Sequence, residues 1–340
     1  MSAGAMKARR ALPRRLAMPA ALISLAAGLG SVVPAPQAAA DAAPMVGSPA
    51  SSAGPASPVT VYVANNDSDF VAPIATATNT AGTTIPVGSD PVDIAITPDG
   101  KTTYVANAGA GTVTPIATAT NTAGPPIPVG GGPVDIAITP DGKTAYVAKF
   151  AGAGTVTPIA TATNTAGPPI PVGGGPYNIA ITPDGKTTYV ANLVSGTVTP
   201  IATATNTAGP PITVGSHPYN IAITPDGKTA YVVNQGTGTV TPIATATNTV
   251  GTPITVGSVP ENIAITPDGK TAYVANAGAG TVSPIATGEA QGSKRANERA
   301  ACGRRDQSQS QRKRSRPRGQ RYIQDQVAQH SNSAASGRCI

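Results

Sequence analysis

The chain has 340 residues, of which 38 are glycine and 35 are proline, whereas charged residues make up only 11% and aromatic residues only 3%. Average soluble domains carry about 25% charged residues, so this composition excludes a solvated helical or coiled-coil protein and favours short strands joined by turns. The net charge is +7, but residues 58–288 hold six lysines and eleven acids, and the basic excess lies in the two ends. The central region therefore gives no reason to expect nucleic-acid binding.

Residues 1–40 have the features of a secretory signal peptide. A basic stretch at 7–15 precedes an apolar run at 16–33, and small residues at 38–40 offer a cleavage site. Proline and glycine interrupt the apolar run, which makes a retained membrane anchor the weaker alternative. We expect an exported protein, secreted or held at the cell surface, that is cleaved near Ala40.

Residues 41–58 lead into the repetitive part of the chain. The sequence at 44–48 is similar to that at 85–89, so residues 44–47 are predicted to form a strand that completes the last repeat and closes the ring. Residues 49–58 have a Ser/Ala/Gly/Pro-rich sequence where later repeats have an apolar strand. We therefore expect the first repeat to have a weak or absent inner strand.

Residues 59–288 consist of six copies of a unit of about 42 residues. The segment ITPDGKT(T/A)YV recurs at spacings of 42, 43, 42 and 42 residues, with aspartates at Asp99, Asp141, Asp184, Asp226 and Asp268. A unit of this length with four short strands is typical of a β-propeller blade. The sequence thus predicts an all-β fold, a β-propeller of about six four-stranded blades.

Each unit is expected to contain four strands joined by short turns. In the second copy, Pro98-Asp99-Gly100 has the composition of a hairpin turn, and residues 121–124 form a second turn. The strands of this copy are predicted at 93–97, 103–107, 112–118 and 127–129. The last copy is predicted to contain three strands, at 262–266, 271–276 and 281–287.

The third strand of every copy contains a proline. Because proline has no backbone N–H to donate, its nitrogen must face a gap, a bulge or a poorly paired outer strand. We expect ragged outer strands next to these residues, which are Pro73, Pro115, Pro158, Pro200, Pro242 and Pro284.

The YVAN, ITPDG and IPVG segments resemble those of the YVTN-repeat β-propellers, which are grouped with lactonase-type and surface-layer propellers of prokaryotes. The resemblance covers all six units. It implies a propeller fold and an extracytoplasmic setting, and it implies little about activity because such folds host different functions. The chain departs from the family in its third strands, which carry proline and alanine where VSVID is usual.

The best candidate for a binding site is the loop that enters each inner strand, since a propeller places these loops at one mouth of its channel. One alternative is that an arc of carboxylates and amides binds a polar ligand or a cation, with tyrosine stacking on a sugar or peptide. The other is that each Asp or Asn ties its loop to the neighbouring blade. The arc consists of Asp93, Asp135, Asn178, Asn220 and Asn262, and Tyr177, Tyr219, His217 and Glu261 lie beside it.

We predict no catalytic residues, no cofactor and no metal ion. The repeated PDG aspartates are expected to cap their own turns, and the region contains one His, one Glu and no Arg or Cys. His217 has no second His or Cys for a transition-metal site. Residues 65–69 offer clustered oxygens for calcium but lack the full ligand set, so a polar turn is the favoured interpretation.

Residues 289–340 are rich in Ser, Gln, Arg and Lys and are predicted to be disordered. Contact with anionic polymers, a solvated tail without a partner, and an altered reading frame are open alternatives for this segment.

For the whole chain we favour an exported, non-catalytic binding or cell-surface scaffold module whose partner is cell-wall polysaccharide or another protein. The alternative is a lactonase-like hydrolase with its site at the channel mouth.

Overall fold

The computed structural model describes residues 60–152 and 154–288. These residues divide into two compact units at the boundary between Pro171 and Val172, and each unit is described by itself. The signal peptide, the segment 41–58 with its predicted closing strand at 44–47, and the basic tail lie outside the described residues. Within the described part, no helix is long and apolar enough to cross a membrane.

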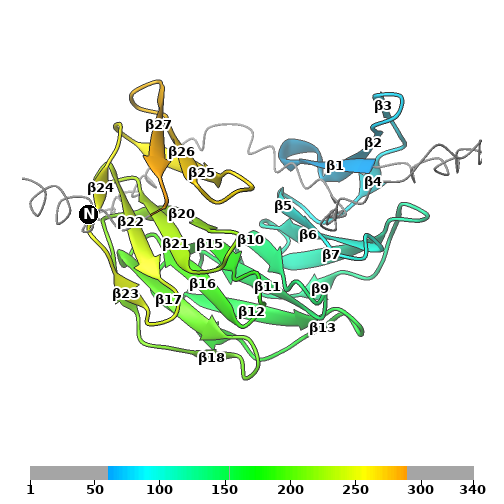
Figure 1. Cartoon of the computed structure of the whole chain (residues 1–340). Coiled ribbons are helices and arrows are strands. Elements are labelled where there is room, and N and C mark those ends of the chain that lie inside the picture. The colour runs from blue at the N-terminus through cyan, green and yellow to red at the C-terminus, as the bar shows by residue number, and fades with distance from the viewer. Residues whose placement is uncertain (1–59, 153, 289–340) are drawn as a thin grey trace, which may run out of the picture. The chain divides into compact units, whose positions relative to one another are not determined.

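The first unit contains three antiparallel sheets, numbered 1 to 3 in chain order (Figure 1). Sheet 1 has β1 (Thr60–Asn65), β2 (Phe70–Ala75), β3 (Thr80–Ala81) and β4 (Ile85–Pro86), and the helical turn η1 (Asn66–Ser68) joins β1 to β2. Sheet 2 has β5 (Pro91–Ile96), β6 (Thr102–Asn107), β7 (Thr112–Ala117), β8 (Thr122–Ala123) and β9 (Ile127–Pro128). Sheet 3 has β10 (Pro133–Ile138), β11 (Thr144–Lys149), β12 (Thr155–Ala160), β13 (Thr165–Ala166) and β14 (Ile170–Pro171).

The second unit contains sheets 4 to 6, which repeat the same pattern. Sheet 4 has β15 (Pro176–Ile181), β16 (Thr187–Asn192), β17 (Thr197–Ala202), β18 (Thr207–Ala208) and β19 (Ile212–Thr213). Sheet 5 has β20 (Pro218–Ile223), β21 (Thr229–Asn234), β22 (Thr239–Ala244), β23 (Thr249–Val250) and β24 (Ile254–Thr255). Sheet 6 has β25 (Pro260–Ile265), β26 (Thr271–Asn276) and β27 (Thr281–Ala286).

The predicted all-β architecture is confirmed: repeated antiparallel sheets account for the described chain, η1 is its one helical turn, and the arrangement is consistent with a propeller. In the second copy the three long predicted strands coincide with β5, β6 and β7 to within two residues at each end. The three strands predicted for the last copy are β25, β26 and β27. Sheet 1 begins at β1, and the expected weak inner strand at 49–58 falls outside the described residues.

The outer edge of a sheet differs from the single fourth strand that we predicted. Thr122 and Ala123, assigned to a turn from the sequence, form the short strand β8, and both β8 and β9 pair with β7. The carbonyl of Pro115, on β7, accepts a hydrogen bond from the Gly124 N–H at 2.7 Å. Because the nitrogen and oxygen of one strand residue point the same way, the Pro115 nitrogen faces the gap between β8 and β9. The prediction of a ragged outer strand is therefore confirmed here.

Neighbouring sheets of a unit pack face to face through small and branched apolar side chains. In the first unit, Tyr104 and Val113 of sheet 2 pack against Ile136 and Val147 of sheet 3. Sheets 1 and 2 share a second cluster, and in the second unit sheet 4 packs on sheet 5 and sheet 5 on sheet 6. Both faces of an inner sheet are buried in this way, which explains why apolar residues occupy successive strand positions.

A tyrosine–asparagine hydrogen bond recurs between neighbouring sheets. The Tyr62 hydroxyl donates to Asn121 Oδ1 of the next sheet at 2.6 Å, and Tyr104 donates to Asn164 in the same way at 2.6 Å. In the second unit Tyr189 donates to Asn248 at 2.7 Å. Each of these asparagines has a φ between 52° and 55°, in the left-handed region that asparagine tolerates. Each asparagine therefore shapes the turn of its own sheet and accepts a hydrogen bond from the tyrosine of the preceding sheet.

Sheet 6 has an exposed face. Tyr273 is 48% exposed and Val282 is 62% exposed, whereas the equivalent Tyr104 and Val113 of sheet 2 are buried. Among the described residues, sheet 6 also has no short outer strands on β27.

Candidate functional site

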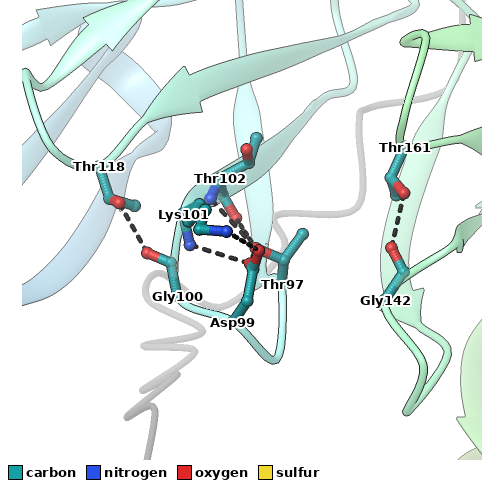
Figure 2. A network of polar contacts seen from close by, with 8 residues as sticks. All are labelled: Thr97, Asp99, Gly100, Lys101, Thr102, Thr118, Gly142 and Thr161. Carbon is teal, nitrogen blue, oxygen red and sulfur yellow. Dashed lines mark hydrogen bonds and ion pairs between the residues drawn. The ribbon is translucent and has the colours of Figure 1, made fainter.

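The PDG turns join the first and second strands of five sheets. The side chains of each turn form hydrogen bonds and an ion pair with groups of the same turn (Figure 2). In sheet 2, Asp99 Oδ1 accepts hydrogen bonds from the Thr97 hydroxyl at 2.7 Å and from the Lys101 N–H at 3.1 Å. The Lys101 ammonium lies 3.3 Å from Asp99 Oδ2, and the Thr118 hydroxyl donates to the Gly100 carbonyl at 2.6 Å. The prediction that these aspartates cap their own turns is thus confirmed.

These contacts set the acidity of the turn carboxyls. The hydrogen bond from the Thr97 hydroxyl and then that from the Lys101 N–H hold the pKa of Asp99 below its ordinary value. Asp141, Asp184, Asp226 and Asp268 have pKa values lowered by the same two kinds of bond. All five carboxylates are therefore ionised near neutral pH and occupied by their own turns.

An open pocket of about 540 Å³ lies between the PDG turns of sheets 2 and 3 and is lined by Asp99, Tyr104 and Asp141, among others. A similar pocket of about 520 Å³ recurs in the second unit beside Asp184 and Asp226. The carboxylates at these pockets are engaged in their turns and lie 3.3 to 3.6 Å from the lysine of the same turn. We therefore place the candidate site elsewhere.

The entry loops of the inner strands bind the turn between the second and third strands of the same sheet. The Gln235 N–H donates to the His217 carbonyl at 2.9 Å, and the Ala277 N–H donates to the Val259 carbonyl at 2.8 Å. His217 and Val259 have φ values of 52° and 50°, at the position where sheet 4 has Gly175. Left-handed backbone is unfavourable for a branched side chain such as valine, so the fold holds this loop in a strained conformation.

The Asp and Asn residues of the predicted arc lie on the inner strands, and two of them bind the next sheet. Asp93 Oδ2 accepts a hydrogen bond from the Ile136 N–H at 2.9 Å, and Asn178 Oδ1 accepts one from the Ile221 N–H at 2.9 Å. These bonds are the contacts that the structural alternative requires. The structure also gives Asp135 an interaction partner.

Asn220 and Asn262, the remaining arc residues, lie at the equivalent positions of β20 and β25. Asn220 is half-buried and Asn262 is exposed. Neither forms a hydrogen bond through its side chain within the described part of the chain. The arc is therefore not uniform, and only some of its members bind the neighbouring sheet.

A β-bulge brings a second set of predicted residues together. The register of β15 on β16 shifts between Pro176 and Asn178, and that of β20 on β21 shifts between Pro218 and Asn220. Tyr177 and Tyr219 are therefore the unpaired residues of two neighbouring inner strands. Their ring centroids lie 4.5 Å apart with planes tilted by 39°, and the Tyr177 hydroxyl donates to that of Tyr219 at 2.7 Å.

Glu261 occupies the bulge position of the next inner strand, β25. Its Oε1 accepts a hydrogen bond from Gln235 Nε2 at 3.3 Å. Tyr177, Tyr219 and Glu261 thus occupy the same bulge position on successive inner strands, and we call them the bulge row. His217 lies in the entry loop of β20, where its Nδ1 is 2.9 Å from the Ser216 hydroxyl and its side chain is exposed. The bulge row combines aromatic faces, hydroxyls and a carboxylate, which suit binding of a polar ligand with apolar faces.

Residues 65–69 form the polar turn that the sequence favoured. η1 covers Asn66–Ser68, and Asp69 Oδ1 accepts a hydrogen bond from the Asp90 N–H at 3.0 Å. The described residues contain no group of three or more His, Cys, Asp or Glu side chains placed to bind a metal ion.

Two residues of interest were missed in the sequence. Gln235, which binds Glu261, lies in the turn after the second strand, where the other copies have an apolar residue (Ala108, Phe150, Leu193 and Ala277). Lys149 replaces the asparagine that ends the YVAN-type strand in the other copies and is only 8% exposed. A copy-by-copy comparison of the repeats would have identified both departures.

Comparison with known proteins supports the propeller architecture. A family model described as "Lactonase, 7-bladed beta-propeller" matches residues 160–304. No curated protein matches the chain.

Solved structures resemble the fold at low sequence identity. A protein of unknown function from Desulfotomaculum acetoxidans DSM 771 is 23% identical with a TM-score of 0.59, over 66% of this chain and 78% of that one. A candidate 6-phosphogluconolactonase from Bacteroides uniformis ATCC 8492 is 21% identical with a TM-score of 0.54, over 67% of this chain and 82% of that one. At these identities the likeness concerns the fold alone.

Proposed function

We propose that the chain is an exported, non-catalytic binding or cell-surface scaffold module of the YVTN-repeat type, with six blades. The observation that carries the proposal is the contrast between constant and variable positions of the repeat. The PDG turns repeat the same closed set of bonds in five sheets, whereas the bulge position changes from valine to tyrosine to glutamate along the chain. A rigid scaffold that varies one row of side chains is suited to recognition.

The ligand that we propose for the bulge row is cell-wall polysaccharide. A sugar ring has apolar C–H faces that stack on aromatic rings and hydroxyls that donate to a carboxylate. Tyr219 supplies the first kind of contact and Glu261 the second. A protein partner is the alternative occupant of the same surface.

Binding of the mature protein to insoluble cell-wall polysaccharide tests this proposal. We expect Tyr219→Ala and Glu261→Ala each to weaken retention, whereas Tyr273→Ala, which removes an exposed tyrosine of β26, leaves it unchanged. Equal retention of all four proteins would contradict the assignment of the bulge row.

A lactonase-like hydrolase is the second candidate function. The match of residues 160–304 to a lactonase family model favours it. His217 in the entry loop of β20 and Glu261 in the bulge row are the imidazole and the carboxyl group that such a hydrolase could use. Turnover of a panel of lactones by the purified protein, lost in both His217→Ala and Glu261→Ala, would replace the scaffold proposal with this one.

Export and the basic tail complete the proposal. We expect the mature chain in culture medium or at the cell surface to begin near Asp41, which N-terminal sequencing would determine.

For residues 289–340 we propose contact with anionic polymers. We expect the binding of the full chain to an anionic wall polymer to fall with added salt, and a chain ending at Gly288 to bind less. Binding that is independent of both salt and the tail would argue against this role.

A further inference from the structure

The last residue of the second strand has a constant role in four copies of the repeat. Asn107 Nδ2 donates to the hydroxyls of Thr112 and Thr114 at 3.2 and 2.9 Å. Asn192, Asn234 and Asn276 donate to the same two positions of their own sheets. The asparagine therefore joins the second strand to the third inside the sheet.

The third repeat breaks this pattern with Lys149. Lys149 is 8% exposed as a whole residue, although lysine is seldom buried without a partner. Thr157, the counterpart of Thr114, is 2% exposed, and its hydroxyl has no hydrogen-bond partner among the described residues. Thr157 pairs with Val147, two residues before Lys149 on the same face of β11. Two buried polar groups on one face of sheet 3 thus lack the bond that the other copies make.

Lys149 has no acidic partner in the part of the chain that the structure describes. Among the described residues, no carboxylate oxygen lies within 4.0 Å of its ammonium nitrogen. Burial lowers the pKa of Lys149 below its ordinary value. The other titratable groups of sheet 3, and the carboxylate that reaches this sheet from sheet 2, are Asp135, Asp141, Lys143, Tyr146 and Asp93.

Lys143 of the same sheet provides the contrast. Its side chain is 82% exposed, and its ammonium lies 3.6 Å from Asp141 Oδ2. Lys143 therefore lacks the burial that disfavours the charged form of an amine.

The Lys149 amine is flanked by an entry loop without side chains. A Cβ atom built on Gly130 would lie 3.3 Å from Lys149 Nζ, and one built on Gly131 would meet no atom within 4 Å. In the corresponding loops of sheets 2 and 5, Ser89-Asp90 and Ser216-His217 supply side chains. The loop of sheet 3 therefore brings no side chain of its own next to the nitrogen.

We propose that Lys149 is a nucleophilic amine that condenses with small uncharged aldehydes to form an imine. The nitrogen lone pair attacks the carbonyl carbon, the resulting carbinolamine loses one water, and a C=N bond replaces the C=O bond without oxidation or reduction. The absence of a counter-charge among residues 60–152 and 154–288 favours the neutral amine, and the buried position favours loss of water. The proposal is independent of the function proposed for the bulge row.

Reductive trapping tests this site directly. The folded full chain is treated with propanal and sodium cyanoborohydride at pH values from 7 to 10, and the modified lysines are mapped by mass spectrometry of peptides. At pH 7 we expect Lys149 to be labelled faster than Lys143, because burial lowers the pKa of Lys149 and so enlarges its neutral fraction. The ratio should fall as the pH approaches the ordinary lysine pKa.

Two variants serve as controls. Lys149→Arg should abolish labelling of its own peptide and leave that of Lys143 unchanged, and Lys143→Arg should leave labelling of Lys149 unchanged. Labelling of Lys149 no faster than that of Lys143 at pH 7, or labelling only after unfolding in urea, would overturn the proposal. These outcomes do not depend on polysaccharide binding, so the two proposals fail separately.

Discussion

Single side chains at the ends of the inner strands hold neighbouring sheets together. Asp93 and Asn178 accept hydrogen bonds from backbone N–H groups of the next sheet, and those groups belong to buried residues, Ile136 and Ile221. A buried N–H that loses its acceptor is costly because water cannot replace it. These contacts connect the local sequence of a strand to the packing of sheets.

We expect Asn178→Ala to lower the free energy of unfolding by about 1–3 kcal/mol, because it leaves the Ile221 N–H without its acceptor. Asn220→Ala is the matched control, since Asn220 occupies the same position on β20 without such a bond in the described chain. It should change the stability by no more than about 0.5 kcal/mol. Urea unfolding of both variants measures the difference, and equal losses would contradict a stabilising role for the bond.

Lys149→Asn should stabilise the protein. The new amide would donate to the hydroxyls of Thr155 and Thr157, as its counterparts do in four other sheets, for a gain of about 1–3 kcal/mol at neutral pH. Lys143→Asn, on the exposed turn of the same sheet, is the control for loss of a lysine charge.

The gain from Lys149→Asn should depend on pH. Burial lowers the pKa of Lys149 in the folded protein, so the unfolded chain binds more protons below the ordinary lysine pKa. The stability of the unsubstituted protein therefore rises with pH toward that value, and the advantage of the variant shrinks. Thermal unfolding from pH 7 to 10 measures this trend, and a constant difference would contradict the pKa assignment.

At the level of elements, the PDG hairpins are the best-defined local structures. Gly100 has a φ of 70°, which glycine adopts without strain. Asp99 joins the threonine before the turn to the backbone after it. The same bonds occur in all five turns, so a change of pH that weakens these bonds in one turn weakens them in the other four.

The turn aspartates predict a loss of stability in acid. Their folded pKa values are lowered, so their contribution is present above the ordinary aspartate pKa and disappears as the pH falls through the folded values. We expect thermal unfolding temperatures to be level from pH 7 to about 5 and to fall below about pH 4. A variant with all five aspartates replaced by asparagine should show a smaller fall, and an unchanged profile would contradict the prediction.

The sequence predicted the hairpins more accurately than the edges. The positions of β5, β6 and β7 follow from turn chemistry and alternation within a few residues, which are local properties. The pairing of Thr122 and Ala123 with β7 was missed, because a two-residue strand has no pattern of its own. The Tyr177–Tyr219 hydrogen bond and the Tyr104–Asn164 bond join residues 42 and 60 positions apart, and such contacts become visible only when sheets are packed.

At the scale of the whole molecule, each unit is a stack of similar sheets, and its stability depends on the contacts between neighbours. The tyrosine–asparagine bond is the polar part of that contact. Tyr104 and Tyr189 make it within the first and second unit, respectively. Tyr273 is exposed at the end of the second unit and makes no such bond to the described residues.

We expect Tyr104→Phe and Tyr189→Phe each to lower the free energy of unfolding by about 1 kcal/mol, because each removes one hydroxyl from a partly buried contact between sheets. Tyr273→Phe should change it by no more than about 0.5 kcal/mol. Calorimetric unfolding of the three variants distinguishes these cases. A similar effect of all three substitutions would show that the bond between sheets contributes little.

The pairing of consecutive strands has a consequence for how the protein folds. In sheet 2 the register joins Thr102 to Ala117 and Pro91 to Asn107, so every hairpin closes a loop of fewer than 20 residues. Short closures carry a low entropic cost, and β-proteins with low contact order fold faster than those with distant pairings. Each sheet can therefore form as soon as its own 42 residues are free, and refolding should begin at several sheets along the chain in parallel.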